Sequence, residues 1–162
     1  MTLDEICESA TEHGLGMVEL TGGEPLAHEE AWPLLKMLCD RFDEVLLETS
    51  GSYPIENIDP RVSVIMDLKA PGSGEDDRNL LENLTVLKPG DEVKIVLADR
   101  NDYEWACQTI QNHEIKVPVL FSPVHGELDP AVLAEWIIQD RIPVRLHLHQ
   151  HKYIWDPAER GR

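Results

Sequence analysis

Apolar and polar residues follow one another along the chain in two patterns, which predict strands and helices in alternation. Short apolar runs between turn residues predict strands at 17–20, 44–48, 62–66, 92–98, 117–121 and 144–149. Longer segments with one apolar face predict helices at 3–13, 29–42, 101–112 and 130–140, and a short helix with a turn within 80–90. This alternation predicts an α/β fold with a parallel sheet covered by helices.

The predicted strands are too few to close an eight-stranded barrel, so a partial barrel fits better, formed by residues 1–162 as a single domain. Parallel strands bring their carboxyl ends to one rim, where α/β folds bind ligands. Polar residues follow the predicted strands at this rim, at Thr21–Glu24, Glu48–Ser50, Asp67–Lys69, Ser122–His125 and His147–His151. Polar residues at the ends of several neighbouring strands are typical of a binding site.

Composition narrows the possible function classes. No apolar run approaches the ~20 residues that span a membrane, and no secretory leader is visible, so we expect a cytoplasmic protein with no membrane partner. The formal net charge of −17 argues against nucleic-acid binding. A carboxylate ligand would need local cations, and Lys69, Arg145 and Lys152 are the candidates.

The segment Thr21-Gly22-Gly23-Glu24-Pro25 joins the first predicted strand to the next helix. Two adjacent glycines let the backbone approach a ligand closely, and the N–H groups of such a turn can hold an anion. Glu24 adds a carboxylate that suits an ammonium group. Together these residues predict a site for a zwitterion, although a glycine pair alone is also consistent with an ordinary turn between a strand and a helix.

This turn resembles the S-adenosylmethionine-binding motif of the radical SAM enzymes. The later stretches LLETSG, VIMDLKAPGSGE and RLHLHQHKYIWDP, beginning at residues 46, 64 and 145, resemble the 7-carboxy-7-deazaguanine synthase family of that superfamily. The resemblance covers essentially the whole chain. It implies a partial (β/α) barrel of the radical SAM type. It also implies a lyase of queuosine biosynthesis that contracts the ring of 6-carboxy-5,6,7,8-tetrahydropterin with loss of ammonia.

The resemblance also implies roles for individual residues. S-adenosyl-L-methionine would be held by Gly22, Gly23, Glu24, Asp67, Leu68, Lys69, Ser122, Pro123, Val124 and His125. The pterin substrate would be held by Thr21, Glu48 and His151. No residue of this chain is expected to be catalytic or to bind a metal.

The cysteines depart from the family pattern. The family holds a 4Fe–4S cluster on a CxxxCxxC motif upstream of the glycine turn, and Mg²⁺ partly on a threonine beside it. Here Cys7, Cys39 and Cys107 fall in separate predicted helices, whereas cluster ligands must converge on one small core. We therefore expect an N-terminally truncated member of the family that is inactive as an isolated chain.

Two alternative functions, one metal site and one oligomeric state remain open at this stage. The chain could be a different radical SAM enzyme, such as an activase that acts on a protein, or a non-catalytic binding protein that kept the rim. His147, His149 and His151 are spaced to point the same way on a strand and could chelate a metal, but Arg145 shares that face and favours a lining role instead. The free edge of the strand at 17–20 could support a homodimer.

Overall fold

Parallel strands form one sheet in which each strand pairs with the next in sequence. The structure is a computed structural model that describes residues 1–156, and within this range the sheet has six strands in the order β1-β2-β3-β4-β5-β6. The strands are β1 (Met17–Leu20), β2 (Glu44–Thr49), β3 (Val62–Asp67), β4 (Glu92–Leu97), β5 (Val119–Pro123) and β6 (Arg145–Leu146). All neighbouring pairs are parallel, which confirms the predicted α/β class and partial-barrel order.

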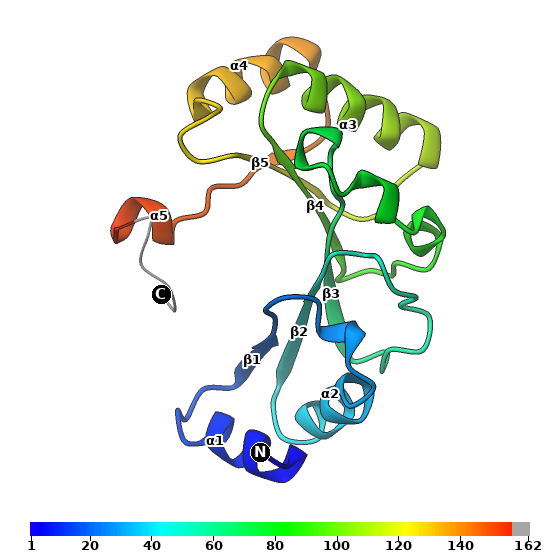
Figure 1. Ribbon diagram of the computed structural model, residues 1–162, viewed down its shortest axis with the longest axis vertical. Coiled ribbons are helices and arrows are strands. Elements are labelled where there is room, and N and C mark those ends of the chain that lie inside the picture. The colour runs from blue at the N-terminus through cyan, green and yellow to red at the C-terminus, as the bar shows by residue number, and fades with distance from the viewer. Residues whose placement is uncertain (157–162) are drawn as a thin grey trace.

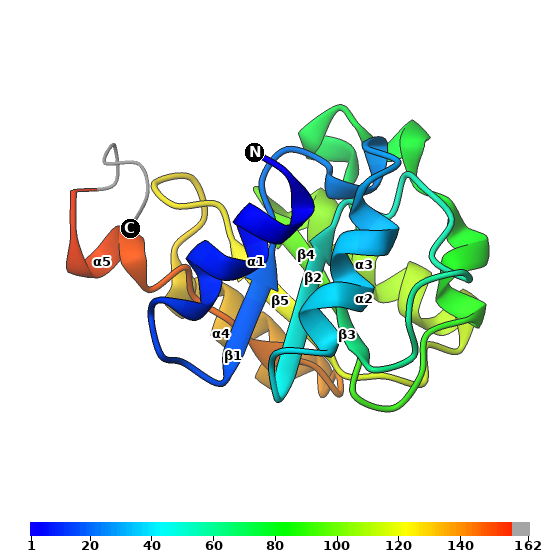
Figure 2. The ribbon, with the colours of Figure 1, turned by 90° about the horizontal axis from the view of Figure 1, so that it is seen from below.

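The longer helices lie around the outside of the curved sheet, and the last helix lies at its opening (Figure 1). The α-helices are α1 (Leu3–Thr11), α2 (Ala31–Cys39), α3 (Arg100–His113), α4 (Pro130–Asp140) and α5 (His151–Ile154). Short 3₁₀ helices are η1 (Pro25–Ala27), η2 (Pro71–Ser73), η3 (Asp76–Arg78) and η4 (Leu81–Thr85). Figure 2 shows α1 and α2 side by side over the strands β1 and β2. In the part of the chain that the structure describes, no helix is long and apolar enough to cross a membrane.

Local signals explain where these helices begin. Thr2 and Glu5 form a reciprocal capping box at the start of α1, in which the Thr2 hydroxyl accepts from the Glu5 N–H and the Glu5 carboxylate from the Thr2 N–H. At α4, the Asp129 carboxylate accepts from the Ala131 N–H at 2.8 Å, and Pro130 occupies the first turn, as predicted.

The two faces of the sheet have opposite character. On the side of the helices the strands place apolar, buried side chains: Val45, Leu47, Val62, Val64, Met66, Val93, Ile95, Leu97 and Phe121. Burying each large apolar side chain contributes ~1.5–3 kcal/mol, so this layer holds the helices on the sheet. The alternate positions, which face the opening, include Glu48, Asp67, Glu92 and Lys94. A parallel sheet covered on both sides is apolar on both, so a polar face indicates an open binding surface.

The C-terminal segment differs from the prediction. The strand predicted at 144–149 extends only over Arg145–Leu146, because it lies at the sheet edge; the His147 N–H still donates to the Phe121 carbonyl at 2.9 Å before the chain leaves the sheet. His151 then begins α5, so His147, His149 and His151 do not share one strand face. The last residue of the HKYIWDP motif, and residues 158–162, lie outside the described residues.

Two other elements also depart from expectation. The helix predicted over 29–42 begins at Ala31 and ends at Cys39, after the separate turn η1. The short helix predicted within 80–90 is a 3₁₀ helix, η4. Neither change moves a strand end. The fifth strand is also shifted, from the predicted 117–121 to Val119–Pro123, so Ser122 and Pro123 end β5 and do not follow it.

Candidate functional site

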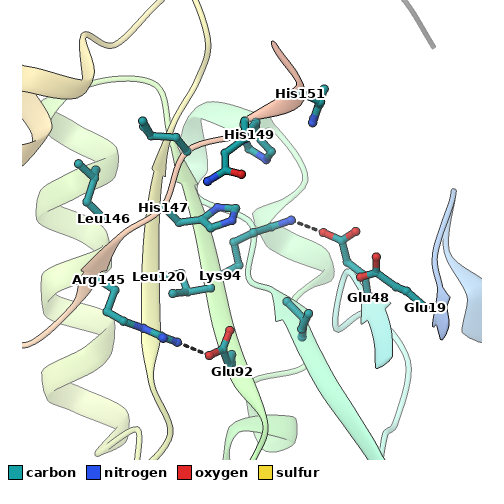
Figure 3. A pocket seen from close by; sticks show the side chains of 13 residues that line it. Glu19, Glu48, Glu92, Lys94, Leu120, Arg145, Leu146, His147, His149 and His151 are labelled. Atoms are coloured by element: carbon teal, nitrogen blue, oxygen red, sulfur yellow. Dashed lines mark hydrogen bonds and ion pairs between the residues drawn. The ribbon is translucent and has the colours of Figure 1, made fainter. Parts of the chain in front are cut away.

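The predicted rim residues lie along one side of the sheet, and a cavity of about 590 Å³ opens beside them on the concave face. Its walls carry charged side chains from β1, β2, β4 and β6, together with the histidine segment that follows β6 (Figure 3). The lining residues are Glu19, Glu48, Ile65, Glu92, Lys94, Leu120, Arg145, Leu146, His147, Leu148, His149, Gln150 and His151. Two predicted substrate residues, Glu48 and His151, therefore meet in one cavity.

Glu48 is held at the cavity wall by donors from two directions. Lys94 forms an ion pair with its Oε1 atom, and the Thr21 hydroxyl donates to Oε2 at 2.9 Å (Figure 3 shows the Lys94 pair). Burial by itself raises the pKa of Glu48, but the Lys94 ammonium and the Thr21 hydroxyl outweigh burial and hold that pKa below its ordinary value. Glu48 is therefore an oriented carboxylate that stays ionised at neutral pH.

Lys94 is a site residue that the sequence reasoning missed. Its side chain is only 9 % exposed, and its ammonium also lies 3.8 Å from Asp67 Oδ2. The sequence did contain a signal that marks Lys94, because a lysine between Val93 and Ile95 interrupts an otherwise buried apolar strand. The predicted cation Arg145 instead pairs with Glu92 at the edge of the cavity.

Asp67, the last residue of β3, and Lys69, two residues beyond it, were predicted to contact S-adenosylmethionine. Lys69 Nζ donates to Asp67 Oδ2 at 2.9 Å, and the Lys69 backbone is fixed in both directions by the Asn79 side chain at 3.0 and 2.8 Å. Asp67 Oδ1 is buried and, among the described residues, has no hydrogen-bond partner. Leaving a buried acceptor unpaired costs ~1–3 kcal/mol, so this oxygen fits a site that accepts a donor from a ligand.

The glycine turn faces open space. Gly22 and Gly23 have φ values of 97° and 56°, and a Cβ atom added at either would have no neighbour within 4 Å. These positive φ values explain why glycine occupies both positions, and the open surroundings leave room for a ligand against the backbone. The turn therefore has the geometry that the sequence predicted for it.

Glu24 has a structural role that the sequence did not predict. Its carboxylate accepts from the Leu26 N–H at 3.0 Å, the Thr49 hydroxyl at 2.8 Å, and the Ser50 N–H and hydroxyl at 2.7 and 2.5 Å. Glu24 thus joins the turn after β1 to the end of β2. An ammonium ligand would meet a carboxylate that is already oriented by these protein donors.

Smaller cavities continue the rim on either side of Lys69. One of about 330 Å³ is lined by Glu24, Ala27, Ser50, Ser52, Tyr53, Lys69, Glu75, Arg78 and Asn79. Another of about 250 Å³ is lined by Asp67, Leu68, Lys69, Ala70, Gly72, Ser73, Val96, Ala98, Asp102, Val124 and Glu127. The structure therefore brings Glu24, the Asp67–Lys69 segment and Val124 along one rim; Ser122, Pro123 and His125 line neither of these two cavities.

The histidine segment closes the far wall of the main cavity. The Ser122 hydroxyl donates to the His147 carbonyl at 2.9 Å and lies 2.9 Å from His147 Nδ1, and the His125 ring contacts Tyr153 edge-on at 5.3 Å between centroids. Burial, followed by repulsion from Lys94, lowers the pKa of His147, and burial with Lys94 and Lys152 lowers the pKa of His149 to about 4. Both imidazoles are therefore neutral at physiological pH.

The described residues do not fit an iron–sulfur cluster. Cys7, Cys39 and Cys107 lie on α1, α2 and α3, as predicted, and all are free thiols. Burial is the main cause that raises the pKa of each thiol, which disfavours the thiolate that binds iron. Within residues 1–156, no group of three or more His, Cys, Asp or Glu side chains has a geometry that could hold a metal ion.

Comparison with known proteins identifies the family. A scan against models of protein families gave no match. The chain is 46 % identical over 166 aligned positions to the 7-carboxy-7-deazaguanine synthase of Chlorobaculum tepidum, covering 99 % of this chain and 76 % of that protein. It is 43 % identical to that of Koribacter versatilis, covering 90 % and 72 %, and 39 % identical to that of Leptospira interrogans, covering 84 % and 63 %. The chain therefore belongs to the 7-carboxy-7-deazaguanine synthase family of radical SAM enzymes.

Proposed function

We propose that the concave cavity binds 6-carboxy-5,6,7,8-tetrahydropterin, and that the adjoining rim binds S-adenosylmethionine, for the synthesis of 7-carboxy-7-deazaguanine. The observation that carries this proposal is Glu48, an ionised carboxylate fixed by Thr21 and Lys94 in the wall of a cavity of about 590 Å³. The pyrimidine ring shared by the pterin and the deazaguanine presents an N–H beside an amino group. A carboxylate accepts such a pair of donors in two parallel hydrogen bonds.

The carboxylate of the ligand needs a cation in the same cavity. Arg145 lies in the cavity wall, where Glu92 is its partner (Figure 3). A guanidinium can bind a second carboxylate through its remaining N–H donors, so Arg145 serves this group without giving up Glu92. The neutral ring of His149, also in the wall, adds a polar but uncharged surface to the pocket.

The S-adenosylmethionine site is supported by the open glycine turn and by Asp67. Gly22 and Gly23 leave their backbone accessible, and the unpaired Asp67 Oδ1 suits a hydroxyl donor such as that of a ribose. Lys69, beside Asp67, supplies a positive charge between the two smaller cavities. In the family, S-adenosylmethionine with its iron–sulfur cluster supplies the hydrogen abstraction that starts the ring contraction. The residues described here bind and orient the two ligands.

A non-catalytic binding protein is the second candidate, and one observation favours it: the three cysteines lie on three separate helices. A different radical SAM reaction, such as that of an activase, is not supported, because all seven relatives found carry the name 7-carboxy-7-deazaguanine synthase. The two remaining candidates share the ligand sites and differ only in turnover.

The other proposed partners follow from charge and thiol chemistry. The net charge of −17 disfavours nucleic acid, so the proposed partners are small molecules. Three free cysteines support a reducing compartment, with the cytosol as the proposed location. A homodimer through the outer edge of β1 is a further proposal, since that edge has no partner strand within residues 1–156 and Met17 is half exposed.

Titration calorimetry with 7-carboxy-7-deazaguanine tests the proposal without any need for turnover. We expect saturable binding that Glu48→Gln weakens by about tenfold or more, because the substituted amide no longer accepts both ring donors. Glu44→Gln is the matched control, since Glu44 lies on the same strand and face at the opposite end of β2. No binding by the unmodified chain, or equal binding by both variants, would contradict the pterin site.

A further inference from the structure

Lys94 lies between the two proposed ligand sites. It projects from the middle of β4 onto the concave face, and its side chain is almost completely buried. Its ammonium reaches across β3 to Glu48 on β2 and lies 3.8 Å from Asp67 at the end of β3. Glu48 belongs to the proposed pterin site and Asp67 to the proposed S-adenosylmethionine site.

Of these two carboxylates, Glu48 is the principal counter-ion of Lys94. The ion pair with Glu48 is a direct hydrogen bond, whereas 3.8 Å to Asp67 exceeds hydrogen-bond range. Asp67 Oδ2 already accepts from Lys69 at 2.9 Å. The charge of Lys94 is therefore directed mainly at Glu48.

Stability alone does not explain a lysine at this position. Burying an ammonium removes its favourable hydration, and a well-packed apolar residue of similar length is often as stable. Val93, Ile95 and Leu97 show that β4 is otherwise built from such residues. Packing does not explain why a lysine occupies this position, whereas its effect on the Glu48 carboxylate does.

We propose that Lys94 is a positioning residue for the pterin: its ammonium keeps Glu48 ionised and turned toward the cavity, so that both carboxylate oxygens can accept the N–H and amino donors of the ring. This inference rests on the proposed function, because it concerns how Glu48 is prepared for that ring. Lys94 acts through Glu48 and does not itself contact the ligand.

The charges around Glu48 make this role necessary. Glu19 on β1 faces the same cavity, and burial and the charge of Glu48 raise the pKa of Glu19. Asp67 on β3 adds a further carboxylate near Lys94. Protonated His149 contributes to the lowered pKa of Glu48, but His147 and His149 are both neutral at neutral pH. Without Lys94, the Thr21 hydroxyl remains as a donor to Glu48. This hydroxyl alone stabilises the carboxylate less than the ion pair with Lys94 does, so Glu48 without Lys94 takes up a proton at a higher pH than in the wild type. A protonated Glu48 presents an O–H donor to the ring donors of the ligand.

The first experiment follows the Glu48 carboxyl directly. The side-chain carboxyl carbon of Glu48 is titrated by NMR in the free chain, in Lys94→Met, Lys94→Gln and Lys94→Arg, and in the control Lys36→Met. Lys36 is an exposed residue of α2, so its removal subtracts the same charge away from the cavity. We expect the midpoint to rise in Lys94→Met and Lys94→Gln, to stay near that of the wild type in Lys94→Arg, and not to move in Lys36→Met. An unchanged midpoint in both neutral Lys94 variants overturns the inference. Lys94→Gln keeps a hydrogen-bond donor and serves if Lys94→Met fails to fold.

The second experiment measures binding of 7-carboxy-7-deazaguanine against pH in the same variants. One pH unit below its own Glu48 midpoint we expect Lys94→Met to bind about tenfold more weakly than the wild type, because about a tenth of its Glu48 is then ionised, and to recover affinity as the pH rises through that midpoint. Lys94→Arg should restore both affinity and pH profile. If the wild type binds and Glu48→Gln weakens binding, but Lys94→Met keeps the wild-type affinity and profile, then the role of Lys94 is wrong while the pterin site stands. If the wild type does not bind, the proposed function fails, and the NMR midpoints alone decide whether Lys94 controls Glu48.

Discussion

Ser50 donates both its backbone N–H and its hydroxyl to the same oxygen of Glu24, at 2.7 and 2.5 Å. This contact joins the glycine turn after β1 to the end of β2, two segments 26 residues apart in sequence. The sequence predicted that the Glu24 carboxylate binds a ligand ammonium. In the structure it is a clamp, because it links the glycine turn to the end of β2 through hydrogen bonds. The position of the glycine turn, and hence of the proposed S-adenosylmethionine site, depends on it.

Glu24→Ala should destabilise the fold as well as affect ligand binding. The substitution leaves the Leu26 and Ser50 N–H groups without their acceptor, and each such loss costs ~1–3 kcal/mol. We expect the free energy of unfolding in urea to fall by about 2–4 kcal/mol. Glu29→Ala, at an exposed position in the loop before α2, is the control and should change it by less than about 0.5 kcal/mol. Equal stability of the two variants would show that the Glu24 clamp contributes nothing.

A pair of glycine variants tests the packing of the rim against the sheet. Gly51 and Gly74 have φ values of 73° and 68°, so alanine at either is strained by ~1 kcal/mol or more. A Cβ atom at Gly51 would lie 2.9 Å from the Met66 side chain, whereas at Gly74 it would meet nothing within 4 Å. Gly51→Ala should therefore lower the unfolding free energy by about 1–3 kcal/mol more than Gly74→Ala. Similar losses in both variants would mean that Met66 moves aside freely.

The pH dependence of stability should contain a contribution from His149. Its pKa is lowered from 6.5 to about 4 in the folded chain, so between these values the unfolded chain binds a proton that the folded chain does not. The unfolding free energy therefore falls as the pH drops from 6.5 toward about 4. His149→Gln should reduce this loss, with thermal melts at closely spaced pH values as the measurement. The control His13→Gln replaces an exposed histidine of the N-terminal segment. If the slope of unfolding free energy against pH stayed unchanged in His149→Gln and changed in His13→Gln, the assignment of this pH dependence to His149 would be contradicted.

The isolated chain should not assemble a 4Fe–4S cluster. Its thiols lie on three different helices, and burial raises their pKa values. Anaerobic reconstitution with iron and sulfide, followed by desalting, should leave no stoichiometric iron and no broad visible absorbance. Iron that is retained by the wild type and lost after Cys7, Cys39 and Cys107 are replaced by serine would overturn this expectation.

The sequence predicted those features that depend on neighbouring residues. The strand Met17–Leu20 and the helix Pro130–Asp140 were found where the apolar pattern and the Asp129-Pro130 cap placed them. The predicted end of β6 was wrong, because the alternation of apolar and polar residues over 144–149 cannot show that the chain leaves the sheet at an edge. Lys94 was missed because its partner Glu48 is 46 residues away and lies across an intervening strand, β3.

The contacts of Glu24 were hidden for the same reason. A carboxylate after a glycine pair indicates a ligand site or a turn, but its partners Thr49 and Ser50 come from the next strand. The parallel register of β1 with β2, which pairs Leu20 with Leu47, brings them together. The sequence placed these residues at the ends of neighbouring strands, and only the fold showed which of them are hydrogen-bonded to one another.

Turnover by a cluster-loaded form of the protein tests the central claim most directly. For this test, a segment that bears the CxxxCxxC motif of the family is joined to the N-terminus of the chain. The protein is then reconstituted anaerobically and supplied with S-adenosylmethionine, a reductant and 6-carboxy-5,6,7,8-tetrahydropterin. Mass spectrometry should detect 7-carboxy-7-deazaguanine, and Glu48→Gln should reduce its rate by about tenfold or more, since one lost hydrogen bond to a charged group is worth ~1.5–3 kcal/mol. Glu44→Gln should retain the rate. A protein that holds the cluster and binds S-adenosylmethionine, yet leaves the tetrahydropterin unchanged, would contradict the assignment of this rim to 7-carboxy-7-deazaguanine synthesis.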